Sequence, residues 1–201
     1  MAQESSIPSP HEWGVGCRFS LYPMCDDFTG VILGALREAD GTGLEVETDD
    51  VSTYVGGDER AILRYVCDVV AAASRRTGHV VAHLLLSRGC PGEVTCELGD
   101  DDAPPPASAL PALPPTGVRA AAHWSLYPLG VTGHMDTIAA AVTSADTLTG
   151  SVHYASRLDG DLAEVLTTIG AGWVEAGAHV RHVVTHATVS VGSPTVREVL
   201  A

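Results

Sequence analysis

The chain has 201 residues, enough for one large domain or two small ones, and its 45% hydrophobic and 18% charged residues are typical of a globular protein. Acidic residues outnumber basic residues 25 to 11, giving a formal net charge of -14, which argues against a general nucleic-acid-binding protein. No apolar run is long enough to cross a membrane, and the first ten residues lack a signal-peptide pattern. Five cysteines without a CxxC pair indicate mostly buried thiols in a reducing cytoplasm.

The first half of the chain has a readable order of elements. Alternating polarity predicts a strand over residues 15–22, which Pro23 ends. A helix capped by Asp26 or Asp27 follows, then two short strands over 44–48 and 51–55, a helix capped by Asp58, and a long strand over 79–87.

The second half repeats short motifs of the first half in the same order. Ser20-Leu21-Tyr22-Pro23 returns as Ser125-Leu126-Tyr127-Pro128, and His79-Val80-Val81-Ala82-His83 returns as His182-Val183-Val184-Thr185-His186. The pattern Ser87-Arg88-Gly89-Cys90-Pro91 likewise matches Ser190-Val191-Gly192-Ser193-Pro194. Matches in one order at nearly one offset indicate a tandem duplication.

The second half is therefore expected to have the same elements, namely strands over 118–127, 151–158 and 180–191, helices over 132–144 and 161–176, and a short strand near 147–149. The order βαββαβ predicts an α+β protein made of two tandem ferredoxin-like, ACT-like repeats with antiparallel sheets. We place the repeats at residues 11–98 and 118–201, joined by an exposed linker over 99–117 that is rich in Asp and Pro. The two sheets can pair face to face or edge to edge, and a homodimer is expected.

Polar side chains on the repeated strand suggest a binding site in each half. Arg18, Ser20 and Tyr22 share one strand face, and His123, Ser125 and Tyr127 share the matching face. Hydroxyl groups both donate and accept hydrogen bonds, which suits the edge of an aminopyrimidine, and carboxylates could neutralise a cationic ligand. The candidate ligand-binding residues are Arg18, Ser20, Tyr22, Asp27, Asp50, Ser52, Thr53, His123, Ser125, Tyr127, His153 and Ser156. Alternatively, these side chains are simply exposed or satisfied across an interface.

Metal binding and catalysis have little support in the sequence. His79 and His83, like His182 and His186, are four residues apart on predicted strands, so each pair would be separated by about 13 Å along its strand. The chain has no lysine, no GxSxG and no Walker A motif, which removes Schiff-base chemistry and a P-loop. We therefore expect a binding protein with no catalytic residues, no metal and no cofactor.

Several longer motifs resemble one family. The segments GCRFSLYPMCDDF (16–28), DVSTYVGG (50–57), SRGCPG (87–92), HWSLYPL (123–129) and VHYASRLDGD (152–161) are similar to the YkoF-type thiamine/hydroxymethylpyrimidine-binding proteins. The resemblance implies a homodimer of tandem ferredoxin-like repeats, with one site per repeat for thiamine or its hydroxymethylpyrimidine precursor and no catalysis. It also implies a cytoplasmic role in uptake or salvage of vitamin B1, linked to a membrane transporter of thiamine precursors.

Two other functions remain open at this point. One is an ACT-like regulatory module that binds an amino acid and signals to a partner enzyme. The other is a dimeric α+β-barrel enzyme that uses His123 or His153 as an acid/base. The sequence also leaves open whether thiamine, a thiamine phosphate or the free pyrimidine is the ligand.

Overall fold

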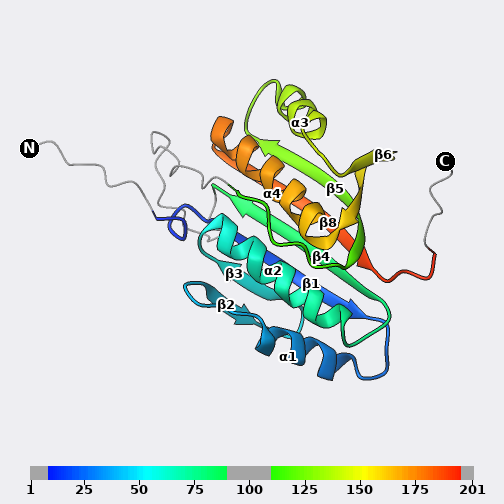
Figure 1. Cartoon of the computed structure of the whole chain (residues 1–201). Coiled ribbons are helices and arrows are strands. Elements are labelled where there is room, and N and C mark those ends of the chain that lie inside the picture. Colours follow the sequence, from blue (N-terminus) through cyan, green and yellow to red (C-terminus); the bar gives the residue numbers. More distant parts are fainter. Residues whose placement is uncertain (1–8, 90–109, 196–201) are drawn as a thin grey trace, which may run out of the picture.

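The computed structural model describes residues 9–89 and 110–195 and contains the βαββαβ order twice (Figure 1). The first repeat comprises β1 (Gly16–Pro23), α1 (Phe28–Glu38), β2 (Glu45–Thr48), β3 (Thr53–Gly56), α2 (Glu59–Ser74) and β4 (Val80–Arg88). The second comprises β5 (Arg119–Leu129), α3 (His134–Thr143), β6 (Leu148–Val152), β7 (Ala155–Asp161), α4 (Leu162–His179) and β8 (His182–Val191). The tandem ferredoxin-like fold predicted from the sequence is confirmed.

The two repeats share one sheet. Its eight strands run antiparallel in the order β2-β3-β1-β4-β8-β5-β7-β6, so β4 and β8 pair at the centre and the repeats join edge to edge. The four helices cover the same face of this sheet (Figure 1). The other side is free of helices in the part of the chain that the structure describes, and we call it the open face.

The core lies between the sheet and the helices. Cys17, Phe19 and Leu21 of β1 are buried, whereas the residues that alternate with them are exposed or half-buried on the open face. Trp124 of β5 is fully buried in the matching layer of the second repeat, and its indole Nε1 donates a hydrogen bond to Thr185 Oγ1 at 2.7 Å. This alternation gives one apolar and one more polar face to each strand.

A buried ion pair ties the repeats together beneath the helices. Arg88 Nε donates to Glu59 Oε1 at 2.9 Å, and Arg88 Nη1 donates to the carbonyl oxygen of Gly177 at 2.7 Å. Arg88 belongs to β4, Glu59 begins α2 and Gly177 lies in α4 of the second repeat. Since a buried charge is tolerated when it is paired and hydrogen-bonded, this contact can link β4 and α2 of the first repeat to α4 of the second inside the core.

The helix starts follow the sequence closely. Asp27 accepts a hydrogen bond from the Gly30 amide at the start of α1, and Asp58 accepts two from amides in the first turn of α2. Asp161 begins α4 with a reciprocal capping box that includes Glu164. Short polar side chains satisfy the otherwise unpaired amides of a helix start. The predicted caps at Asp27 and Asp58 are therefore confirmed, and Asp161 caps the equivalent helix of the second repeat.

One predicted strand was wrong. The segment 151–158 is not a single strand, because a turn at His153 and Tyr154 separates β6 from β7. Tyr154 has a φ of 66°, a left-handed conformation that a strand does not contain. β6 and β7 pair antiparallel on either side of this turn, as β2 and β3 do in the first repeat.

The end of the predicted linker is attached to the second repeat. Thr116 and Gly117 donate backbone hydrogen bonds to the carboxylate of Asp161, and the Leu113 amide donates to Thr167 Oγ1 at 3.2 Å. Leu113 is half-buried against the core. Most of residues 110–117 are exposed and form no helix or strand, so this end of the predicted linker runs along the surface of the second repeat, while residues 99–109 lie outside the described part of the chain.

Three of the five cysteines lie within the described residues. Cys17 and Cys67 are buried and Cys25 is half-buried, and all three are free thiols. Burial raises the pKa of Cys17 and of Cys67 to about 12, so both stay protonated and unreactive. Cys90 and Cys96 lie outside the described residues. No helix in the described ranges is long and apolar enough to span a bilayer.

Candidate functional site

A pocket lies at the free outer edge of β1. β3 pairs with β1 only as far as the Phe19–Thr53 register, so the edge of β1 from Ser20 onward has no neighbouring strand. The pocket has a volume of about 110 Å³ and lies between this edge, α1 and the turn that joins β2 to β3. Its lining consists of Phe19, Ser20, Leu21, Ile32, Leu36, Thr48, Asp49, Asp50, Val51, Ser52 and Thr53.

The polar wall of this pocket is held in place by hydrogen bonds. Ser20 Oγ donates to the carbonyl oxygen of Val51 at 2.9 Å. Asp49 Oδ1 accepts from the amides of Val51 and Ser52, both at 2.8 Å, and Arg18 Nη1 donates to Asp49 Oδ2 at 3.1 Å. The two amide bonds, with Arg18 in a lesser role, lower the pKa of Asp49. Asp49 is therefore ionised at neutral pH and forms an ion pair with Arg18 in the wall.

Four of the predicted first-repeat residues meet at this pocket, namely Ser20, Asp50, Ser52 and Thr53. Thr53 is buried and shares a 3.0 Å hydrogen bond with Thr48. Arg18 reaches the pocket wall from the open face by donating to Ser52 Oγ at 2.9 Å. Tyr22 and Asp27 are not among the lining residues: Tyr22 is exposed on the open face, and Asp27 caps α1.

The second repeat forms the same edge. β7 pairs with β5 only as far as the Trp124–Ser156 register, which leaves the edge of β5 free from Ser125 onward. Ser125 Oγ donates to the carbonyl oxygen of Tyr154 at 3.0 Å, just as Ser20 donates to Val51. Thr53 and Ser156 occupy equivalent positions, because Thr53 is the last residue of β3 paired with β1 and Ser156 is the last residue of β7 paired with β5.

The two edges differ in their side chains. His123 occupies the position of Arg18 and is exposed, and Tyr127 is exposed like Tyr22. His153 lies in the turn before Tyr154, and their ring centroids are 6.4 Å apart. The second edge therefore presents imidazoles where the first presents a guanidinium and a carboxylate.

The centre of the open face holds a pair of histidines that the sequence analysis did not predict. His83 of β4 and His186 of β8 have their Nε2 atoms 2.7 Å apart, so one ring donates to the other. Burial lowers the pKa of His186, and the neighbouring His83 lowers it further. Ser20 lies beside His83 on β1, and Ser125 lies beside His186 on β5.

This pair belongs to a symmetric ladder across the junction of the repeats. His79 Nε2 lies 3.1 Å from Ser190 Oγ, and His182 Nε2 lies 3.4 Å from Ser87 Oγ. Histidines four residues apart on one strand do not meet, but antiparallel pairing of β4 with β8 brings the equivalent histidines of the two repeats together. The equal positions of HVVxH in both repeats were the signal for this contact. Among the described residues, no group of three or more His, Cys, Asp or Glu could hold a metal ion.

The fold and this repeated edge define a class of protein: a duplicated ferredoxin-like chain with a small polar pocket at the outer strand edge of the first repeat. Comparison with known proteins gives the family. The model of the YKOF-related Family matches residues 14–93 and 119–196, one match for each repeat, and the chain belongs to this family. A curated relative from Bacillus subtilis (strain 168), named "Putative HMP/thiamine-binding protein YkoF", is 32% identical over 185 residues, covering 90% of this chain and 91% of the relative.

Proposed function

We propose that this protein binds thiamine or its hydroxymethylpyrimidine precursor without catalysing a reaction, with one site at the outer strand edge of each repeat. The family and the name of the Bacillus relative support thiamine-related binding. The observation that carries the proposal is the repeated contact in which Ser20 Oγ meets the Val51 carbonyl and Ser125 Oγ meets the Tyr154 carbonyl. A duplicated hydroxyl beside an unpaired strand edge offers donors and acceptors in the same arrangement twice.

The chemistry of the first pocket fits the two halves of thiamine differently. Its volume of about 110 Å³ is well below the roughly 300–1,000 Å³ of a site that encloses a whole drug-sized ligand. The pocket therefore takes the aminopyrimidine ring, whose nitrogens and amine pair with Ser20, Thr53 and the free backbone edge of β1. The cationic thiazolium remains at the mouth, close to the carboxylates of Asp49 and Asp50.

The two sites differ in affinity. The first combines hydroxyls with Asp49 and Asp50, whereas the second combines Ser125 and Ser156 with His153. Asp49 and Asp50 outnumber the one guanidinium, Arg18, at the first site, so a net negative charge attracts the cationic thiazolium there and thiamine binds the first repeat more tightly than the second.

The cellular setting follows from the ligand and from the open face. We place the protein in the cytoplasm, where it holds the vitamin or its precursor during uptake or salvage, next to a membrane transporter of thiamine precursors. Exposed apolar side chains on the open face, including Tyr22, Leu85 and Tyr127, favour a homodimer in which two open faces pack together.

Isothermal titration calorimetry with thiamine and with hydroxymethylpyrimidine tests the binding site directly. The full chain is expected to bind both compounds, with two sites per chain. Ser20→Ala removes a hydrogen-bonding group worth about 1–3 kcal/mol, so it weakens the tighter site by roughly 5- to 150-fold, and Ser125→Ala weakens the other site alone.

A matched control is Ser74→Ala at the end of α2, where the hydroxyl donates to the Ala71 carbonyl within its own helix. This variant should bind like the wild type. Absence of heat and of thermal stabilisation at millimolar thiamine and pyrimidine would contradict the function. Unchanged affinities in both Ser20→Ala and Ser125→Ala would contradict the site while leaving the function intact.

A further inference from the structure

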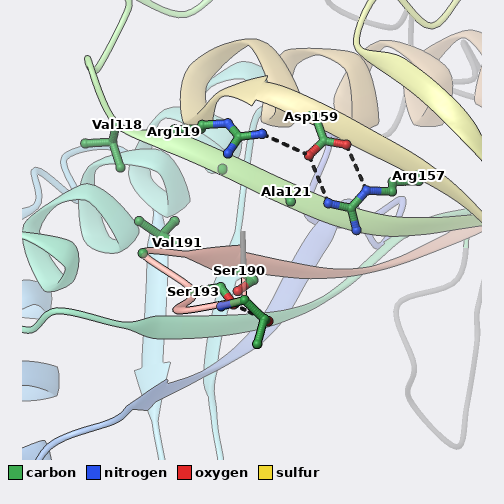
Figure 2. Close-up of a pocket in the computed structure, with 11 residues that line it drawn as sticks. Val118, Arg119, Ala121, Arg157, Asp159, Ser190, Val191 and Ser193 are labelled. Atoms are coloured by element: carbon green, nitrogen blue, oxygen red, sulfur yellow. Dashed lines mark hydrogen bonds and ion pairs between the residues drawn. The ribbon is translucent and has the colours of Figure 1, made fainter. Parts of the chain in front are cut away.

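A second and larger pocket lies at the rim of the open face in the second repeat (Figure 2). Its volume is about 370 Å³, and it occupies the ends of β5, β7 and β8. Arg119, Arg157 and Asp159 line one side, and Ser190 and Ser193 line another. Ser125 and Ser156 are not among its lining residues, so it is separate from the thiamine site proposed above.

The charges in this pocket leave a net positive site on an acidic protein. Arg157 donates to both carboxylate oxygens of Asp159, each at 2.9 Å, and Arg119 Nη2 lies 3.7 Å from Asp159 Oδ1 (Figure 2). Burial opposes ionisation of Asp159, but the hydrogen bonds from Arg157 and Thr149 and the charge of Arg119 outweigh it and lower the pKa of Asp159. Two guanidinium groups thus face one carboxylate, and Asp159 is the sole acid in the described lining.

The first repeat fills the equivalent position with an aromatic ring. Tyr54 pairs with Arg18 as Arg157 pairs with His123, so Tyr54 and Arg157 occupy matching places. The Tyr54 ring covers Gly16 and Gly56, where an added Cβ would lie 2.9 Å and 2.5 Å from the nearest Tyr54 atom.

In the second repeat, the residues in place of those two glycines are Ala121 and Asp159, paired with each other as Gly16 and Gly56 are. The duplication has therefore exchanged a filled aromatic position for an arginine-lined pocket. This exchange of Tyr54 for Arg157 lies at the end of the sheet formed by β5, β7 and β8.

We propose that this pocket binds a phosphate monoester of a small organic molecule. A guanidinium offers five N–H donors, so Arg157 retains donors after its two bonds to Asp159, and Arg119 adds a second, half-exposed cation. The hydroxyls of Ser190 and Ser193, which contact His79 and Thr195 in this structure, lie at the facing strand end and become additional donors if they turn toward the ligand. The volume exceeds what a phosphate group needs and falls in the range of sites for small organic ligands.

The test is a titration of the full chain with phenyl phosphate, measured by calorimetry and by thermal shift. Phenol and inorganic phosphate are titrated in the same way for comparison. Phenyl phosphate is expected to bind and stabilise the protein, inorganic phosphate to bind more weakly, and phenol not to bind. Arg119→Gln, at a half-exposed side chain, should weaken phenyl phosphate about tenfold or more. Arg157→Gln should weaken it further, with circular dichroism to check the fold.

Arg60→Gln, at an exposed arginine of α2, is the matched control and should bind phenyl phosphate like the wild type. Thiamine affinity should be unchanged in Arg119→Gln, which separates this pocket from the proposed thiamine sites. No binding of phenyl phosphate, or equal losses in Arg119→Gln and Arg60→Gln, would overturn the proposal. Equal affinity for inorganic phosphate and phenyl phosphate would overturn the assignment to an ester.

Discussion

The His83–His186 pair is the residue-scale feature with the clearest physical consequence. An imidazole can donate to another imidazole only while the pair holds a single bridging proton, so full protonation places two like charges in contact. The nearest charged or titratable side chains in the same rows of the open face are Arg18 and His123, and neither carries a negative charge that could compensate. The pair is therefore stable at neutral pH, and protonation of both rings in acid destabilises the folded state.

The first prediction concerns stability against pH. The pKa of His186 is lowered in the folded state, so the unfolded chain takes up a proton more readily and stability falls as pH drops below the ordinary histidine pKa of about 6.5. The melting temperature should decrease from about pH 7.5 to about pH 5.5, and this decrease should be smaller in His186→Gln. Some dependence remains, because burial also lowers the pKa of His182.

The control for this experiment is His134→Gln, at an exposed histidine that begins α3. Its melting temperature should follow the wild-type pH profile. Carboxylates such as Asp49 and Asp159 have lowered pKa values, so their contribution is lost only below about pH 4 and does not interfere. Identical pH profiles for wild type and His186→Gln would contradict the assigned role of the pair.

At the scale of elements, the structure explains why a glycine recurs after each central strand, at Gly89 and at Gly192. Gly89 follows β4 and Gly192 follows β8, with φ values of 98° and 70°. A Cβ on Gly89 would lie 1.8 Å from the Arg181 carbonyl oxygen, and one on Gly192 would lie 2.1 Å from the Gly78 carbonyl oxygen. Each glycine therefore allows one repeat to cross closely over the start of the other repeat's final strand.

The second prediction tests this junction. Gly192→Ala combines an unfavourable backbone conformation with a steric clash, so it should lower the free energy of unfolding by roughly 1–3 kcal/mol or more. Gly150→Ala in β6 is the control, because an added Cβ there meets nothing within 4 Å, and its effect should be small. Urea denaturation measures both. Equal free energies of unfolding for the two variants would contradict the prediction that a Cβ at position 192 clashes with the Gly78 carbonyl.

Most helices and strands could be predicted from the sequence because the duplication presents each element's pattern twice. Capping aspartates and alternating strands are local signals, so Asp58 and the strand containing Ser20 were predicted correctly. The turn at Tyr154 was missed because it has a left-handed tyrosine where a glycine or asparagine would have marked it.

Contacts between the repeats could not be predicted from either repeat alone. The His83–His186 pair depends on the pairing of β4 with β8, and the sequence left edge-to-edge and face-to-face pairing equally open. The Arg157–Asp159 pocket lies within the second repeat, but it depends on side-chain contacts at the ends of β5, β7 and β8 that a strand pattern does not give. The gathering of Ser20, Ser52 and Thr53 at one pocket was foreseeable, since strand alternation and the short turn between β2 and β3 are both local.

At the scale of the whole molecule, the composition of the open face supports the proposed homodimer. This face extends across both repeats and exposes large apolar side chains from strands of each, among them Tyr22, Leu85, Tyr127 and Leu129. An antiparallel sheet can present one face to water, but that face is then polar. A sheet face with several exposed apolar groups is typical of an interface.

The proposed dimer can be tested by comparing two leucines of equal exposure. Leu85 lies on the open face and is 42% exposed, whereas Leu33 lies on α1 and is 43% exposed. Leu85→Asp would place a strongly hydrated carboxylate between two packed sheets, opposite Arg18 of the same chain, so light scattering after size exclusion should show a monomer. Leu33→Asp adds the same charge to the helix layer and should remain a dimer. A monomeric wild type, or a Leu85→Asp variant that stays dimeric, would contradict packing through the open face.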